Sequence, residues 1–99
     1  MDFLELQRQF ESKLKDTFKF ELLELHYMPY SFGTGIIAYR IKGRLIRILY
    51  NGRDHEIEVS SSKPHEKYPN ASWSTVFIGK PSELFDKGIE QLSELFGWV

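Results

Sequence analysis

The sequence predicts one α+β domain, residues 1–99, built as a two-layer sandwich in which a five-stranded antiparallel meander is flanked by an N-terminal and a C-terminal helix. Three observations predict this architecture. Apolar residues repeat with a helical period near both ends of the chain, and they alternate with a strand period between them. Turn-forming residues separate the alternating segments. The expected order of elements is therefore α-β-β-β-β-β-α.

The first helix is expected over residues 2–16. Phe3, Leu6, Phe10 and Leu14 follow one another at spacings of three and four, which places them on one face of a helix. Asp2 is a suitable N-cap, and its charge is favourable at the positive end of the helix dipole. This helix should pack its apolar face on the sheet.

The first strand is expected within "FKFELLELHYMPY", residues 18–30. Its alternation of apolar and polar residues slips by one position at Leu22-Leu23, as happens where a β-bulge adds a residue to a strand. The alternative is a longer first helix and a later strand. Pro29 ends the strand, and "SFGTG" forms the following turn.

The next three strands are expected at "TGIIAYRIKG", "RLIRILY" and "DHEIEVS". Lys42-Gly43 and Asn51-Gly52 are candidates for two-residue turns, and Asn-Gly is the strongest short hairpin signal because a type I′ turn requires positive φ at both positions. These turns would pair Tyr39 with Ile46 and Arg47 with Glu56. The resulting core face consists of Ile37, Tyr39, Ile41, Ile46, Ile48, Ile57 and Val59.

The last third of the chain is expected to hold a polar loop over residues 60–72, a fifth strand at "WSTVFIG" and a helix opened by Pro81 and Ser82. Gly88 lies inside this helix, where glycine is unfavourable, and so indicates a close approach to the sheet. The apolar stripe of the helix is Leu84, Phe85, Ile89, Leu92, Leu95 and Phe96.

Composition excludes several classes of function. The net charge of −1 provides no overall attraction to nucleic acid or to an anionic membrane. The absence of cysteine excludes disulfides, thiolate zinc sites and cysteine nucleophiles, and it fits a cytoplasmic location. No signal peptide is expected, and no segment approaches the roughly 18 apolar residues of a membrane span.

No catalytic, metal-ligating or cofactor-binding residue is predicted. His26, His55 and His65 lack the spacings of metal ligands, and His55 is expected to be a packed residue on the core face. The serines before His65 lie in a polar loop without an evident third group to orient a nucleophile. "SFGTGI" lacks the strand-then-helix context of a phosphate-binding loop. We therefore expect a protein that is not an enzyme.

The sheet face opposite the core combines aliphatic residues with paired charges, which is typical of a protein-contact surface. The alternative is that part of the chain folds over this face. Tyr68 in the long loop is a further candidate, the alternative being that it holds the loop down on the protein, and the C-terminal aromatics Phe96 and Trp98 are expected to be exposed. The protein-contact candidates are Ile36, Leu45, Arg47, Leu49, Tyr68 and Trp98.

The leading hypothesis is thus a small non-enzymatic binding protein that acts through protein contacts on the sheet face, with self-association into a homodimer as one form of it. The alternative is a nucleic-acid-binding module. Its candidates form a basic cluster in the sequence, namely Arg40, Lys42, Arg44 and Arg53.

Overall fold

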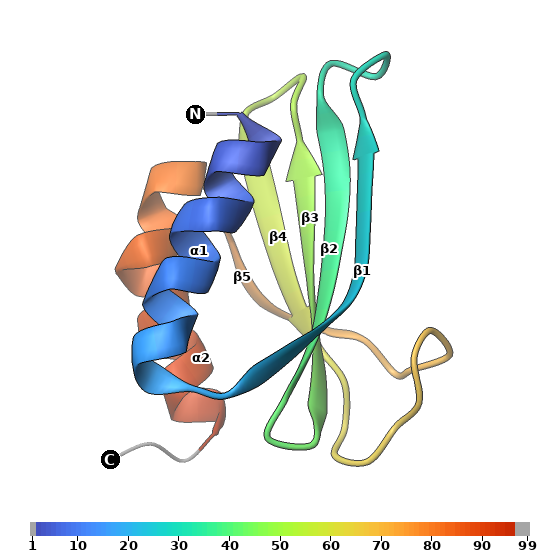
Figure 1. The fold of residues 1–99 in the computed structure, drawn as a ribbon, viewed down its shortest axis with the longest axis vertical. Coiled ribbons are helices and arrows are strands. Elements are labelled where there is room, and N and C mark those ends of the chain that lie inside the picture. The colour runs from blue at the N-terminus through green and yellow to red at the C-terminus, as the bar shows by residue number, and fades with distance from the viewer. Residues whose placement is uncertain (1, 97–99) are drawn as a thin grey trace.

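The five strands form one antiparallel sheet, and both helices lie on the same side of it, as the computed structural model of residues 2–96 shows (Figure 1). The sheet order follows the chain: β1 (Phe20–Met28), β2 (Thr34–Ile41), β3 (Arg44–Asn51), β4 (Glu56–Ser61) and β5 (Ser74–Gly79). The other layer contains α1 (Phe3–Thr17), the 3-10 helix η1 (Pro81–Phe85) and α2 (Lys87–Leu95). The predicted α+β sandwich is confirmed.

Helix α1 forms as its apolar spacing predicts. The Asp2 carboxylate accepts a hydrogen bond of 2.8 Å from the backbone N–H of Glu5, which satisfies one of the free donors at the helix start. The four apolar positions are fully buried: Phe3, Leu6, Phe10 and Leu14. Burial of each such side chain stabilises the fold by about 1.5–3 kcal/mol.

Strand β1 contains the predicted bulge. Leu22 pairs with Tyr39 and Glu24 with Ala38, so Leu23 is an extra residue in the ladder. The strand ends at Met28, directly before Pro29, as expected. β1 is an edge strand, because β2 is its one neighbour in the sheet.

The β2–β3 hairpin also follows the prediction. Lys42 and Gly43 both have positive φ, 50° and 78°, as the two central positions of a type I′ turn require. Tyr39 pairs with Ile46 across this hairpin, in the expected register.

The predicted two-residue turn at Asn51-Gly52 is wrong. Asn51 pairs with Glu56, and residues 52–55 form the loop between β3 and β4. The side-chain carbonyl of Asn51 accepts hydrogen bonds from the backbone N–H groups of Arg53 and Asp54, at 3.1 and 3.3 Å. This cap stabilises a longer loop than the Asn-Gly pair suggests. His55 lies in this loop, exposed and with φ of 49°, and not on the core face.

The register error leaves the two sheet faces unchanged. Arg47 lies opposite Ser60, and the expected pairing of Arg47 with Glu56 is therefore wrong. The partner strand is displaced by an even number of residues, and side chains alternate with a period of two, so each one keeps its side of the sheet. All seven predicted core-face residues are fully buried: Ile37, Tyr39, Ile41, Ile46, Ile48, Ile57 and Val59.

One buried polar group is satisfied by α1. The Tyr39 hydroxyl donates a hydrogen bond of 2.9 Å to the Glu11 carboxylate. Burial, followed by the negative charge of Glu11, raises the pKa of Tyr39 far above its usual range. The phenol therefore stays neutral and joins helix to sheet.

The C-terminal helix is interrupted, contrary to the prediction of one helix from Pro81. Asp86 separates η1 from α2, and its carboxylate accepts a hydrogen bond from the N–H of Lys87 at the start of α2. Gly88 is buried against Leu84 and Phe77, which confirms its close approach.

Two predictions concern the C-terminal aromatics. Phe96 is not the exposed side chain that was expected: its ring lies 5.2 Å from that of Phe18, and it packs on the core. Trp98 lies outside the described residues.

Candidate protein-contact site

The sheet face opposite the helices is partly covered by the loop of residues 62–73. Leu45 and Ser62 exchange two hydrogen bonds of 2.9 Å, from the Leu45 N–H to the Ser62 hydroxyl and from the Ser62 N–H to the Leu45 carbonyl. Leu45 and Ala38 are fully buried. The expectation that Leu45 is exposed is therefore wrong, while Ile36 and Leu49 are half-buried.

Arg47 and Tyr68, two of the predicted contact residues, contribute to this cover. The Arg47 guanidinium lies 4.3 Å from the centre of the Trp73 ring, a cation–π distance, and the edge of Tyr68 packs against Trp73. The Glu66 carboxylate accepts hydrogen bonds of 2.8 Å from the backbone N–H groups of Lys63 and Ser72. These hydrogen bonds hold the pKa of the Glu66 carboxyl below its usual range, and the bond from Ser72 has the largest effect.

The predicted basic cluster is divided between the two ends of the sheet. Lys42 and Arg44 flank one end of β3, where the Arg44 guanidinium donates to the Ser62 carbonyl at 3.1 Å. Arg40 forms an ion pair of 3.7 Å with Glu21. Arg53 lies beyond the other end of β3, over the Phe32 ring. At the rise of an extended strand, the two ends of β3 are about 25 Å apart. The four side chains do not form one patch.

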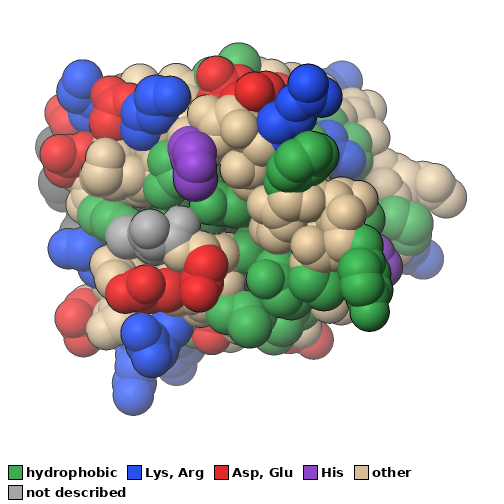
Figure 2. Space-filling view, turned by 90° about the horizontal axis from the view of Figure 1, so that it is seen from above, with side chains coloured by type: hydrophobic (Ala, Val, Ile, Leu, Met, Phe, Trp, Pro, Cys, Tyr) green, Lys and Arg blue, Asp and Glu red, His purple; other side chains and the backbone are tan. Residues whose placement is uncertain are grey.

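The free edge of the sheet carries exposed apolar side chains that the sequence reasoning missed. We define the edge surface as Leu22, Leu25 and Tyr27. Three side chains on β1 are exposed to similar extents: Leu22 by 43%, Leu25 by 41% and Tyr27 by 38%. Leu4 of α1 is 47% exposed. Figure 2, seen from above, shows hydrophobic side chains in several places on this end of the molecule, with the densest group at the lower right.

The edge surface lies on the helix side of the sheet. Leu25 pairs with Ile37, which faces the helices, and Phe3 of α1 stacks on Tyr27 with the ring centres 5.5 Å apart. Glu24 and His26 pair with Ala38 and Ile36 and so point to the opposite side. The alternation in the sequence identified β1 as a strand, but it contains no signal that a strand lies at an edge.

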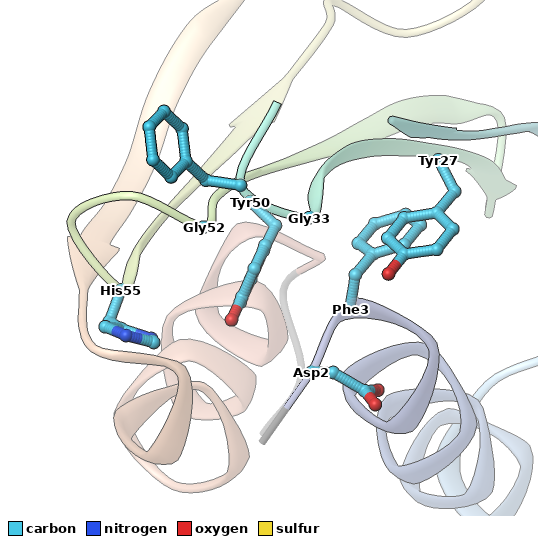
Figure 3. Close-up of a pocket in the computed structure, with 8 residues that line it drawn as sticks. Asp2, Phe3, Tyr27, Gly33, Tyr50, Gly52 and His55 are labelled. Carbon is cyan, nitrogen blue, oxygen red and sulfur yellow. The ribbon is translucent and has the colours of Figure 1, made fainter. Parts of the chain in front are cut away.

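A pocket of about 370 Å³ opens beside the upper end of the edge surface (Figure 3). It lies where the start of α1, the β1–β2 turn and the β3–β4 loop meet, and its lining consists of Asp2, Phe3, Tyr27, Phe32, Gly33, Tyr50, Gly52 and His55. Figure 3 shows the Tyr50 ring between His55 and the Phe3–Tyr27 pair.

The pocket combines aromatic walls with one carboxylate. Burial raises the pKa of Tyr50, and the negative charge of Asp2 adds to this effect. Phe3 forms part of the wall because Gly35 lies directly beneath it: a Cβ on Gly35 would come within 2.4 Å of the ring. Such a lining suits a planar or positively charged group.

Comparisons with known proteins provide no further guide: no family model, curated protein or solved structure matches this chain. Within residues 2–96, no three His, Asp or Glu side chains lie close enough together to hold a metal ion. No helix in the described part of the chain is long and apolar enough to cross a membrane.

Proposed function

We propose that this protein is a non-enzymatic binding protein and that its partner is a protein chain that docks on the edge surface. The observation that carries the proposal is the free edge of β1, a strand of nine residues bordered by the exposed side chains of Leu22, Leu25 and Tyr27. The site differs from the sheet face that the sequence favoured, because the loop of residues 62–73 covers part of that face.

An open edge strand supports protein binding through its backbone. The outward N–H and C=O groups of such a strand lack partners within the sheet, so an incoming extended segment pairs with them and lengthens the sheet. Apolar side chains beside the edge contribute burial and select the partner. The bulge at Leu22–Glu24 interrupts the ladder, so regular pairing is limited to the part of β1 that follows it.

The experiment is site-specific photocrosslinking in cells that make the protein. A photoreactive amino acid at Leu25 is expected to give a discrete protein adduct. The matched control places the same group at Ile78 of β5, which is 54% exposed on the other edge strand and should give none. Absence of adducts from Leu22, Leu25 and Tyr27, or equal adducts from Ile78, would contradict the proposal.

Nucleic-acid binding, the alternative prediction, gains no support from this geometry, because the basic residues lie at two ends of the sheet and Arg40 is paired with Glu21. Phosphate contact requires several cations on one surface. A cytoplasmic location remains part of the proposal and rests on the absence of cysteine.

A further inference from the structure

We propose that the partner on the edge surface is a second copy of this chain, and that the two β1 strands pair antiparallel about a two-fold axis at Leu25. The two sheets would then form one continuous sheet with all helices on one side. This inference rests on the proposed function, since it names the occupant of the same surface.

The geometry of a two-fold axis restricts the possible registers. Two identical antiparallel strands in one sheet are related by an axis perpendicular to that sheet, and residues directly opposite each other then share a face. One residue of β1 must therefore lie opposite its own copy. Glu24, Leu25, His26 and Tyr27 are the candidates, since the bulge precedes them and Pro29 follows the strand.

Three of these four registers are unfavourable, for different reasons. An axis at Glu24 places two carboxylates face to face, and an axis at His26 places Glu24 opposite Met28, which offers the carboxylate no hydrogen bond. An axis at Tyr27 places Leu25 opposite Pro29, which has no N–H to donate to the ladder.

An axis at Leu25 makes both faces of the ladder complementary. On the side away from the helices, Glu24 lies opposite His26 of the second copy, and the symmetry repeats this contact. On the helix side, Leu25 lies opposite its own copy, with Tyr27 two residues further along each strand. This register buries the exposed side chain of Leu25 and forms a regular ladder over residues 24–26, which directly follow the bulge.

The opposite edge of the sheet does not offer the same complementarity. β5 has six residues, and its exposed positions are Ser74, Thr75 and Ile78, so it carries one exposed large apolar side chain where β1 carries three. The two edges therefore differ in a way that favours pairing through β1.

Disulfide formation tests the register directly, because the chain contains no cysteine. Residues opposite each other in an antiparallel pair have Cα atoms roughly 4.5–5.5 Å apart, within the range of a disulfide. Leu25→Cys is expected to form a covalent dimer under mild oxidation, and Ile78→Cys is its control. A mixture of Glu24→Cys and His26→Cys chains should form the mixed disulfide in preference to either homodimer.

Charge exchange provides a second test that needs no covalent bond. His26→Glu opposes two pairs of carboxylates and is expected to weaken dimerisation about tenfold in sedimentation equilibrium. The double variant Glu24→His, His26→Glu again places a carboxylate opposite an imidazole that can donate a hydrogen bond to it, so its dimerisation should return toward that of the native chain. Failure of this rescue would overturn the register.

The outcomes separate this inference from the proposed function. A native chain that sediments as a monomer, with a Leu25→Cys variant that forms no more dimer than Ile78→Cys, overturns the second copy as partner. If Leu25 then photocrosslinks to a different protein, the edge surface remains the binding site. If it crosslinks to none, both proposals fail.

Discussion

The two edges of the sheet differ in how many exposed apolar side chains they carry. At the β5 edge, Phe77 packs against Leu84 of η1 and Gly88 of α2, and the loop of residues 62–73 leads directly into the strand. Ile78 is the one exposed large apolar side chain on β5, whereas β1 carries three, at Leu22, Leu25 and Tyr27. An edge with exposed apolar residues favours pairing with another chain. The comparison thus identifies the edge at which binding is expected.

The largest predicted effect concerns Phe3, the buried ring on which Tyr27 of the β1 edge stacks. Phe3→Ala removes a fully buried ring that stacks on Tyr27 and lies against Gly35, so unfolding in urea should show a loss of about 3–5 kcal/mol. Leu4→Ala is the adjacent control and should cost less than about 1 kcal/mol, because Leu4 is half exposed. Equal losses in the two variants would contradict the large contribution of Phe3 to the stability of the fold.

A pair of glycine substitutions compares the packing at the two edges. Gly35→Ala forces a Cβ to within 2.4–2.6 Å of three atoms of the buried Phe3 ring, so a loss of about 1–3 kcal/mol is expected. Gly88→Ala brings its Cβ to 2.8 Å from the flexible end of Leu84. The gain in helix propensity, about 1 kcal/mol, offsets that contact. Thermal unfolding of both variants tests the ranking, and a more destabilised Gly88→Ala would reverse it.

A smaller effect is expected from the loop that covers the other face. Glu66→Ala removes the acceptor for the N–H groups of Lys63 and Ser72, so these amides should exchange faster with solvent. Because the folded state lowers the pKa of Glu66, its contribution to stability is present above the unfolded pKa and is lost as the pH falls through the folded one.

The urea midpoints of the native chain and Glu66→Ala should therefore differ at neutral pH and converge in acid. Dimerisation through β1 should be unchanged in this variant. A stability difference that persists in acid would mean that the carboxylate is not its source.

The smallest effect is expected at Arg47. Arg47→Met removes the cation over Trp73 but keeps an apolar stem, and its cost should be about 0.5–1 kcal/mol. The buried Nε of Arg47 has no hydrogen-bond partner among the described residues, so the substitution breaks no hydrogen bond there. In a Trp98→Phe background, Trp73 emission should shift to the red. An unchanged spectrum would contradict the contact.

The two hairpins show which parts of the fold could be predicted. Lys42-Gly43 forms the expected turn because its backbone conformation follows from local residues. The loop after Asn51 is longer because a side-chain cap competes with the turn signal. The core face was nevertheless predicted correctly, because an even displacement leaves every side chain on its own side of the sheet.

The candidate site was less predictable than the fold. The contact between Arg47 and Trp73 joins residues far apart in the sequence, so no local pattern shows that the loop covers Leu45. The exposure of Leu25 likewise follows from the place of β1 in the sheet order. Alternation in a single strand gives its two faces but not its neighbours.

The most direct test of the central claim is amide hydrogen exchange measured at several protein concentrations. We predict that the amides of residues 24–26 become more protected as concentration rises, while those of β5 keep the same exchange rates. Exchange in residues 24–26 that is independent of concentration would contradict the account of β1 as the edge at which two copies pair.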